Sequence, residues 1–257
     1  MSIPSRIVAV DCGNTLLKMT FFVDGEPVNA VASEFDDLDS LAPLLDEWEA
    51  EGAVVCASGH SGERLMEMLH RHVGGPVHLV DRTTPMPIVI DYATPHTLGL
   101  DRIADALGAM RCYPGCGAVV ADAGTALTLD VIDGDGTFRG GNISPGINMR
   151  LRAMHEHTAA LPEVSLTGDI PAVGYDTLTA MRSGAVLGVA SEIVMAYVSA
   201  SRCSDCSMLV VTGGDAPLLL DIIRNMLASL GLEPKVAYAP LLVAYGLLSI
   251  YDYNEKD

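Results

Sequence analysis

The same pattern of apolar and polar positions occurs twice along the chain. In the first half, the apolar run 7–10 is followed by Asp-Cys-Gly-Asn-Thr at 11–15, which we call the first turn. In the second half, the apolar run 118–121 is followed by Asp-Ala-Gly-Thr at 122–125, the second turn. An apolar run that ends in Asp, Gly and a hydroxyl residue predicts a buried strand that leads into a tight turn. The chain is therefore expected to be duplicated.

Each turn leads into a second apolar stretch that ends in a Gly-rich reversal. The reversals read Val-Asp-Gly-Glu at 23–26 and Ile-Asp-Gly-Asp-Gly at 132–136, and such sequences are typical of β-hairpins. In turns of this kind the backbone N–H groups and the Thr oxygen can face an anion, while the carboxylate can hold a metal ion. Two such turns could bind one polyphosphate from opposite sides.

The rest of the first half predicts strands and helices in alternation. The expected elements are a strand ending at Val10, strands at 16–23 and 27–33, an acidic helix at 37–51, a strand at 53–57, and a helix beginning at Ser61. Residues 76–90 favour short strands and loops, because Pro85 and Pro87 interrupt their apolar stretches. A further helix is expected to begin at Asp101 and run through Ala109, since an Asp suits the positive end of a helix.

The second half repeats this order. The expected elements are three strands within 118–138, a loop at 140–146, a strand at 208–211, and helices at 148–157, 177–199, 217–230 and 239–251. Strands followed by crossover helices, twice over, indicate an α/β fold with two sheets that face a cleft. Pro and Gly cluster near 113–117, so we expect two domains, 1–115 and 116–257.

Composition narrows the class of protein. Of the 257 residues, 49% are hydrophobic, which excludes a largely disordered chain. No apolar run reaches the ~18 residues that span a bilayer, and the first residues lack the pattern of a secretory signal. We therefore expect a cytoplasmic protein with no membrane partner. The formal net charge of −18 repels phosphate backbones and no basic patch offsets it, so we expect no nucleic-acid partner.

Several common motifs are absent. The chain has no G-x-x-x-x-G-K-[ST] loop, no G-x-G-x-x-G after a strand and no G-x-S-x-G elbow, which removes the P-loop, Rossmann and serine-hydrolase interpretations. The pairs Cys112/Cys116 and Cys203/Cys206 are spaced closely enough for zinc, but neither sits in a knuckle sequence. Reduced thiols are the favoured interpretation.

The Gly-bearing turns that remain resemble those of the actin, hexokinase and Hsp70 superfamily of ATP-using proteins. Within that superfamily the chain closely resembles type III pantothenate kinase, over essentially its whole length and with the motifs in the family's order. The matching motifs are D-x-G-N-T at 11–15, Tyr92 followed by L-G-x-D-R at 98–102, D-x-G-T-A at 122–126, G-G-x-I-x-P-G at 140–146, N-T-x-x-A-I-x-x-G at 176–184 and Thr-Gly-Gly at 212–214. The chain departs from the fifth motif with Asp176 for Asn and Met181 for Ile.

The resemblance implies a fold and a set of site residues. The fold is α/β, with duplicated ribonuclease H-like (actin-like ATPase) domains whose mixed five-stranded sheets flank a central cleft. The implied ATP-binding residues are Asp11, Cys12, Gly13, Asn14, Thr15, Leu16, Leu17, Lys18, Gly124, Thr125, Gly213 and Gly214. The implied substrate-binding residues are Tyr92, Gly99, Leu100, Asp101, Arg102 and Thr177.

The implied activity is ATP-dependent phosphorylation of pantothenate to 4′-phosphopantothenate, the first step of coenzyme A biosynthesis. Phosphoryl transfer needs positioning, neutralised charge and an accepted proton. Asp101 is the expected general base, Arg102 would pair with the pantothenate carboxylate or the transferring phosphoryl group, and Asp11 would orient Mg²⁺ through its water shell. The resemblance adds a monovalent cation, K⁺ or NH₄⁺, at Asp122. It also implies a homodimer to which Thr177 of the partner subunit could contribute.

Simpler interpretations stand beside these. Asp11 and Asp122 could each cap a turn, although their repetition behind matching strands argues against this. Residues 140–141 could be only a loop between a strand and a helix. Asp101 and Arg102 could be an ordinary surface pair at a helix start.

Two other functions also fit the motifs. One is another small-polyol kinase of the same superfamily, and pantothenate-dependent release of ADP would distinguish it. The other is a non-catalytic nucleotide-binding regulator, which DNA binding at physiological salt would favour.

Overall fold

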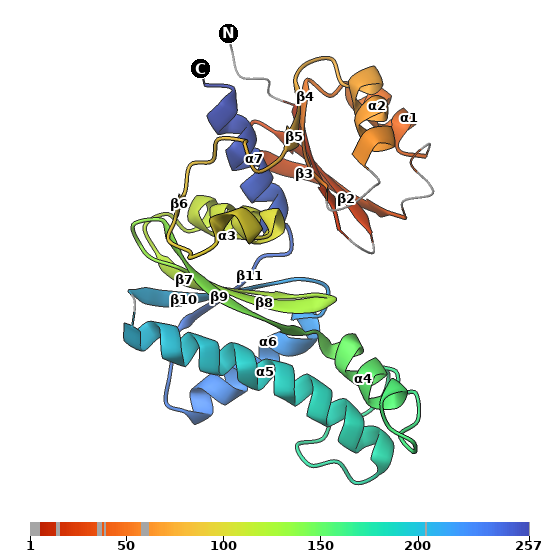
Figure 1. Ribbon diagram of the computed structural model, residues 1–257, viewed down its shortest axis with the longest axis vertical. Coiled ribbons are helices and arrows are strands. Elements are labelled where there is room, and N and C mark those ends of the chain that lie inside the picture. Colours follow the sequence, from red (N-terminus) through yellow and green to blue (C-terminus); the bar gives the residue numbers. More distant parts are fainter. Residues whose placement is uncertain are drawn as a thin grey trace. The chain divides into compact units, whose positions relative to one another are not determined.

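The chain folds into two compact units (Figure 1). The structure is a computed structural model, and it describes residues 6–13, 16–34, 38, 40–57, 62–203 and 205–256. The first unit comprises Met1–Val89, Ala93–Tyr113 and Leu241–Asp257. The second unit comprises Ile90–Tyr92 and Pro114–Pro240.

The first unit is built on a five-stranded mixed sheet with the strand order β3-β2-β1-β4-β5. Its strands are β1 (Arg6–Cys12), β2 (Leu17–Val23), β3 (Glu26–Ser33), β4 (Gly52–Ala57) and β5 (Val77–Val80). The first three form an antiparallel meander, and β4 and β5 run parallel to β1. The turn between β2 and β3 has Asp24 at φ 50° and Gly25 at φ 83°, as a two-residue hairpin turn requires. The predicted hairpin is confirmed here.

Helices pack on both faces of this sheet. They are α1 (Ala42–Trp48), α2 (Gly62–His72), α3 (Leu100–Cys112) and α7 (Leu242–Asn254), and the 3₁₀ turn η2 (Pro95–Thr97) precedes α3. Alternate residues of β1, Val8 and Val10, join apolar residues of α1 and α2 in one core, while α7 contacts β1, β4 and α3. The approach of α7 to α3 depends on glycine, because a Cβ at Gly246 would lie only 1.8 Å from the carbonyl oxygen of Ala104.

The second unit repeats this sheet and adds one strand, in the order β11-β10-β7-β8-β9-β6. Its strands are β6 (Val89–Ile90), β7 (Gly117–Ala123), β8 (Ala126–Ile132), β9 (Thr137–Pro145), β10 (Cys206–Thr212) and β11 (Lys235–Tyr238). The meander β7-β8-β9 corresponds to β1-β2-β3, and the parallel strands β10 and β11 correspond to β4 and β5. The predicted duplication is confirmed. Asp11 and Asp122 therefore hold equivalent places near the ends of β1 and β7.

The helices of the second unit are α4 (Ile147–Glu156), α5 (Thr177–Cys203) and α6 (Ala216–Ser229). Apolar residues of α5 and α6 pack against β7, β8 and β10 in the core of this unit, and Figure 1 shows both helices on the same side of the sheet. The start of α5 is capped by Asp176, whose Oδ1 accepts hydrogen bonds of 2.7 Å from both the N–H and the hydroxyl of Thr179. Such a cap stabilises a helix by about 1 kcal/mol, so the Asp that departs from the family motif has a structural role.

By length and composition alone, α5 could cross a membrane, although it contains no uninterrupted apolar run of ~18 residues. Its most apolar window has a mean hydropathy of 1.5, and half of that window is buried. Val186, Val189 and Ile193 of α5 lie in the core of the second unit. The core helix of a globular unit meets the same criteria, so this feature is weak evidence for a membrane span.

Three further elements differ from the expectation. Residues 140–145, expected as a loop, continue β9 and pair with β8, and the register shift there coincides with Gly140 at φ 107°. The second sheet has six strands because β6 joins β9 at its edge. The strand β11 was not expected at all. The predicted starts at residue 37 and Ser61 lie outside the described residues.

The division into units also differs from the expected one at residues 115 and 116. One boundary falls nearby, between Tyr113 and Pro114, but Leu241–Asp257 returns to the first unit. The reason is hydrophobic burial: Leu247, Ile250 and other apolar residues of α7 are fully buried against the first unit, and such burial outweighs proximity along the chain.

Candidate functional site

Asp11 sits at the end of β1 among polar neighbours from three elements. In the sheet it is paired with Lys18 on β2 and with Cys56 on β4. Burial raises the pKa of Asp11, the charge of Lys18 opposes this rise, and the charge of Asp101 adds to it. Coulomb interactions of this kind act over a few ångströms. The structure thus brings Asp11 and Asp101, two of the predicted site residues, together in the first unit.

Asp101 is an exposed residue in the first turn of α3. Its Oδ1 accepts a hydrogen bond of 2.9 Å from the backbone N–H of Arg102. The carboxylate also folds over Gly99, the N-cap, where a Cβ would come within 2.3 Å of Oδ1. Arg82 restrains the segment before the helix, because its Nη1 donates a hydrogen bond of 3.1 Å to the carbonyl oxygen of Leu98. The glycine of L-G-x-D-R is therefore needed for the placement of the acid.

Cys56 is a neighbour of this pair that sequence reasoning missed. Residues paired across parallel strands point to the same face, so Cys56 shares a face with Asp11. Burial, helped by the charges of Asp11 and Asp101, raises the pKa of the Cys56 thiol to about 12. The thiol is neutral at physiological pH. The only sequence signal was the apolar strand at 53–57, which carried no register information.

In each of the two turns, the glycine N–H donates a hydrogen bond to a carbonyl within or next to the turn. The N–H of Gly13 donates to the carbonyl of Leu16 at 3.2 Å, and in the second turn the N–H of Gly124 donates to the carbonyl of Ala126 at 3.1 Å. Each of these two glycine N–H groups thus has an acceptor within or next to its own turn, and the expectation that N–H groups of the two turns face an anion stays a prediction.

The other predicted residues of the first turn divide into two groups. Cys12 and Leu17 are buried in the core of the first unit, so they can contact a ligand only through their backbone. Leu16 and Lys18 are exposed. Asn14 and Thr15 lie outside the described residues.

The second turn lies against the Thr-Gly-Gly motif at 212–214. Gly213 has φ 91°, and a Cβ there would lie 2.4 Å from both Asp122 Oδ1 and the carbonyl oxygen of Ala123. The N–H of Asp215 donates to the same carbonyl at 2.9 Å. Gly213 is thus adjacent to Asp122, which agrees with the expectation that both motifs bind the same nucleotide.

A third motif reaches the second turn through Gly146. Its N–H donates to the carbonyl of Thr125 at 3.2 Å, and a Cβ at Gly146 would lie 2.2 Å from the carbonyl oxygen of Gly124. The end of β9 therefore presses directly on the turn. Three of the sequence motifs meet at this point of the second unit.

Tyr92 is joined to the same β9 strand at its other end. The ring contacts Phe138 edge to face with centroids 6.1 Å apart, and a Cβ at Gly140 would lie 3.4 Å from the ring. The neighbouring Asp91 is held by a salt bridge of 2.8 Å to Arg139. The position of this predicted substrate-binding residue is therefore fixed by the strand that carries the G-G-x-I-x-P-G motif.

The remaining predicted substrate-binding residues differ in their burial. Leu100 is partly buried, and Arg102 is buried with 5% of its surface exposed. Thr177 is exposed at the start of α5. Glu192, further along α5, accepts a hydrogen bond from Ser144 of β9. A helix rises about 1.5 Å per residue, so Thr177 lies about 22 Å from Glu192 along the helix axis.

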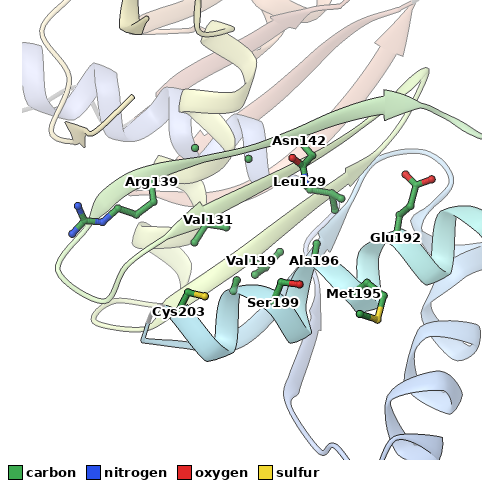
Figure 2. A pocket seen from close by; sticks show the side chains of 13 residues that line it. Val119, Leu129, Val131, Arg139, Asn142, Glu192, Met195, Ala196, Ser199 and Cys203 are labelled. Atoms are coloured by element: carbon green, nitrogen blue, oxygen red, sulfur yellow. The ribbon is translucent and has the colours of Figure 1, made fainter. Parts of the chain in front are cut away.

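Within the described part of the chain, no group of three or more His, Cys, Asp or Glu is arranged to hold a metal ion. A cavity of about 680 Å³ opens between α5 and the sheet of the second unit, and Figure 2 shows side chains of α5 such as Glu192, Met195 and Ser199 along one side of it. None of the predicted ATP-binding or substrate-binding residues lines this cavity.

The fold recurs in solved structures of low sequence identity. A ROK family glucokinase from Streptomyces griseus, in complex with glucose and AMPPNP, superposes with a TM-score of 0.55 at 15% identity and covers 98% of this chain and 100% of its own. The activator of the 2-hydroxyisocaproyl-CoA dehydratase from Clostridium difficile, with bound ADPNP, gives 0.54 at 11% identity, covering 98% and 96%. The chain therefore has the two-domain actin-like fold, with an equivalent turn in each unit.

Sequence comparison gives the family within that class. The profile of type III pantothenate kinase matches residues 7–199. The type III pantothenate kinase of Bacteroides fragilis is 38% identical over 207 residues, 80% of this chain and 84% of its own length. That of Phocaeicola vulgatus is 33% identical over 250 residues, 96% and 98% of the two chains. The chain belongs to the type III pantothenate kinase family, and it is a phosphotransferase.

Proposed function

We propose that this chain transfers the γ-phosphoryl group of ATP to the primary hydroxyl of pantothenate, which gives 4′-phosphopantothenate for coenzyme A synthesis. Family membership supports the substrates. The observation that carries the chemistry is the carboxylate of Asp101, held over Gly99 at the start of α3 and close to Asp11.

Asp101 is the general base in this proposal. An exposed carboxylate can reach a substrate hydroxyl, and its position is restricted by the hydrogen bond from the Arg102 N–H. That bond occupies Oδ1 and leaves Oδ2 to accept the proton as the oxygen attacks phosphorus. Catalysis then depends mainly on the alignment of the hydroxyl with the γ-phosphoryl group.

Asp11 fits a role toward Mg²⁺. Its carboxylate is partly buried, and its pKa is raised by burial and by Asp101, so a nearby cation would favour its ionised form. Mg²⁺ prefers oxygen ligands and keeps several waters, which agrees with an approach to Asp11 through its hydration shell. When bound, Mg²⁺ would neutralise charge on the triphosphate. Lys18, paired with Asp11 across the strands, supplies a second positive charge.

The second turn is proposed to contribute to ATP binding and to hold a monovalent cation, K⁺ or NH₄⁺. Asp122 supplies a carboxylate oxygen next to the backbone of Gly213, where no side chain fits. Thr125 is exposed at the tip of the turn, and Gly214 lies in open space. Proteins that share this fold have been solved with ATP analogues bound. A bound cation would offset phosphate charge in a chain with only fifteen Lys and Arg.

Pantothenate is proposed to contact Tyr92, the segment 99–102 and Thr177. Tyr92 and Gly99 are fixed by packing, and Arg102, a buried residue in the first turn of α3, places a guanidinium one residue after the base. Thr177 lies about 22 Å along α5 from Glu192, the residue that bonds to β9. This distance supports a contribution of Thr177 to the pantothenate site of a partner copy, so we propose a homodimer. The acidic composition supports a cytoplasmic enzyme with no nucleic-acid or membrane partner.

A coupled assay tests this proposal. Purified protein, ATP and Mg²⁺ should release ADP only when pantothenate is added, and replacing K⁺ with Na⁺ should weaken nucleotide binding. Asp101→Asn should lower kcat by roughly 10²-fold or more while ATP affinity is retained. ADP release with other alcohols but not with pantothenate would favour a different kinase of the superfamily. DNA binding at physiological salt without ADP release would favour a regulator.

A further inference from the structure

Glu192 on α5 and Arg150 on α4 form a connected set of polar contacts around the end of β9. Glu192 Oε1 accepts from Arg150 Nη2 at 2.7 Å, and Glu192 Oε2 accepts from the hydroxyl of Ser144 at 2.6 Å. Arg150 Nε donates to the carbonyl of Pro145 at 2.7 Å, and its Nη2 donates to Ser144 Oγ at 3.2 Å. Glu192 and Arg150, from two helices, therefore make four hydrogen bonds of 2.6–3.2 Å to each other and to residues 144–145.

This set is adjacent to the second turn. Gly146 follows Pro145 directly, donates its N–H to the carbonyl of Thr125 at 3.2 Å, and lies too close to Gly124 to carry a side chain. Pro145 is also paired with Ala126 across β8 and β9. Any movement of residues 144–145 would therefore move the backbone that presses on the turn.

The geometry of the pair suits fixed positioning. The guanidinium uses both its Nε and one Nη, so its plane is defined, and each carboxylate oxygen of Glu192 has its own donor. Arg150 also crosses Gly188 of α5, where a Cβ would lie 3.3 Å from Nη1. Figure 2 shows Glu192 projecting from α5, and Glu192 and the β9 residue Asn142 both line the cavity.

A simple stabilising role does not account for this arrangement. The side chains of Arg150 and Glu192 are 20% and 40% exposed, and ion pairs with that much exposure contribute little to global stability. Their effect is expected to be local, on the one backbone segment that both side chains contact.

We propose that Glu192 and Arg150 are positioning residues for the second turn: together they hold the end of β9 so that Gly146 sets the conformation of Gly124 and Thr125. Neither residue is among the predicted ATP-binding residues. The inference rests on the proposed function only in that the second turn is taken to bind ATP. The positioning itself can be measured in the protein without any ligand.

The test is hydrogen–deuterium exchange of the full-length, unliganded protein. Glu192→Gln and Arg150→Lys should each raise exchange in peptides that cover residues 123–127 by roughly tenfold, while the strands β10 and β11 keep wild-type exchange. The matched control is Asp221→Asn, which removes an exposed ion pair of 3.3 Å with Arg224 within α6; it should leave residues 123–127 unchanged.

Steady-state kinetics supply the functional arm. In both variants the KM for ATP should rise roughly five- to tenfold, with the KM for pantothenate and kcat near wild type, since a displaced turn loses binding made equally in ground and transition states. Unchanged exchange at 123–127, or a rise spread over the whole unit, would overturn the proposal. An inactive wild-type protein would count against the proposed function alone, because the exchange result does not depend on activity.

Discussion

The carboxylate of Asp101 occupies the place that a side chain at Gly99 would take, with Oδ1 only 2.3 Å from an ideal Cβ at that glycine. The backbone of Gly99 has φ −60° and ψ 138°, which any residue can adopt. The side-chain contact with Asp101, two residues away, therefore favours glycine at position 99, whereas the backbone conformation would accept any residue.

Gly99→Ala should separate the placement of the acid from its presence. The added methyl group displaces a flexible carboxylate, so the fold should survive while kcat falls by roughly tenfold, less than for removal of the acid. Gly184→Ala is the control, because a Cβ at this exposed helical glycine meets nothing within 4 Å; it should keep full activity and gain up to about 1 kcal/mol of stability. Wild-type kcat in Gly99→Ala would contradict the proposed placement of Asp101.

Ionisation of Asp11 should lower the free energy of unfolding of the unliganded protein as pH rises. Its pKa is raised in the folded state, so between its unfolded value of 3.8 and the raised folded value the folded protein holds the extra proton, and stability falls with increasing pH. Above that window the cost of the ionised carboxylate is constant. Asp11→Asn should therefore unfold at a higher urea concentration than wild type at pH 8, and at the same concentration near pH 3.

The same substitution should weaken Mg²⁺-ATP binding by roughly tenfold or more, which calorimetry can measure. Stability and binding would then change in opposite directions. A lower urea midpoint for Asp11→Asn at pH 8 would show that Lys18, and not burial, dominates the environment of Asp11.

Gly213 and Gly231 allow a matched comparison of two glycines with positive φ. Gly231 has φ 68°, and an ideal Cβ there would meet no atom within 4 Å. Gly213 has φ 91°, and an ideal Cβ there would lie 2.4 Å from two atoms of the second turn. Gly231→Ala should cost about 1–2 kcal/mol from backbone strain alone. Gly213→Ala should cost more and should also reduce ATP affinity, because the backbone of Ala123 must move. Equal unfolding free energies for the two variants would argue against close contact at Gly213.

The cysteines should differ sharply in reactivity at pH 8. Cys203 is exposed, while Cys56 and Cys206 are buried and their pKa values are raised to about 12 and about 11. Since the thiolate is the reactive form, iodoacetamide should modify Cys203 first and reach Cys56 and Cys206 only after unfolding. Peptide mass spectrometry in buffer and in urea would measure this. Modification of Cys56 at the rate of Cys203 would mean that its strand position beside Asp11 is wrong.

The sequence predicted the fold well because the fold is carried by local patterns. The repeated strand and turn at Asp11 and Asp122 indicated duplication, and the two sheets have the same topology apart from β6. The placement of α7 could not be read in the same way, since an apolar helix at the end of a chain does not reveal which sheet it covers. Residues 140–145 were expected to form a loop because two glycines usually interrupt strands, and here Gly140 fits the register shift inside one.

The site was predictable where a family motif contains it and not where contacts are distant in sequence. Asp101 and Gly99 could be named from the L-G-x-D-R motif that the chain shares with the family, and the fold brings Asp101 close to Asp11. Cys56 was missed because its role depends on strand register, and Arg150 with Glu192 because 42 positions separate them. The use of the Gly13 and Gly124 N–H groups inside their own turns could not be foreseen without backbone angles.

The return of α7 to the first unit has a consequence for biosynthesis. A nascent chain emerging from the ribosome exposes β1, β4 and α3 long before their covering helix is made, whereas the second unit is nearly continuous from Pro114 to Pro240. The unit that begins first is thus the last one able to finish folding. Until residue 254 has left the exit tunnel, its uncovered apolar surface is the part of the chain that needs protection by chaperones.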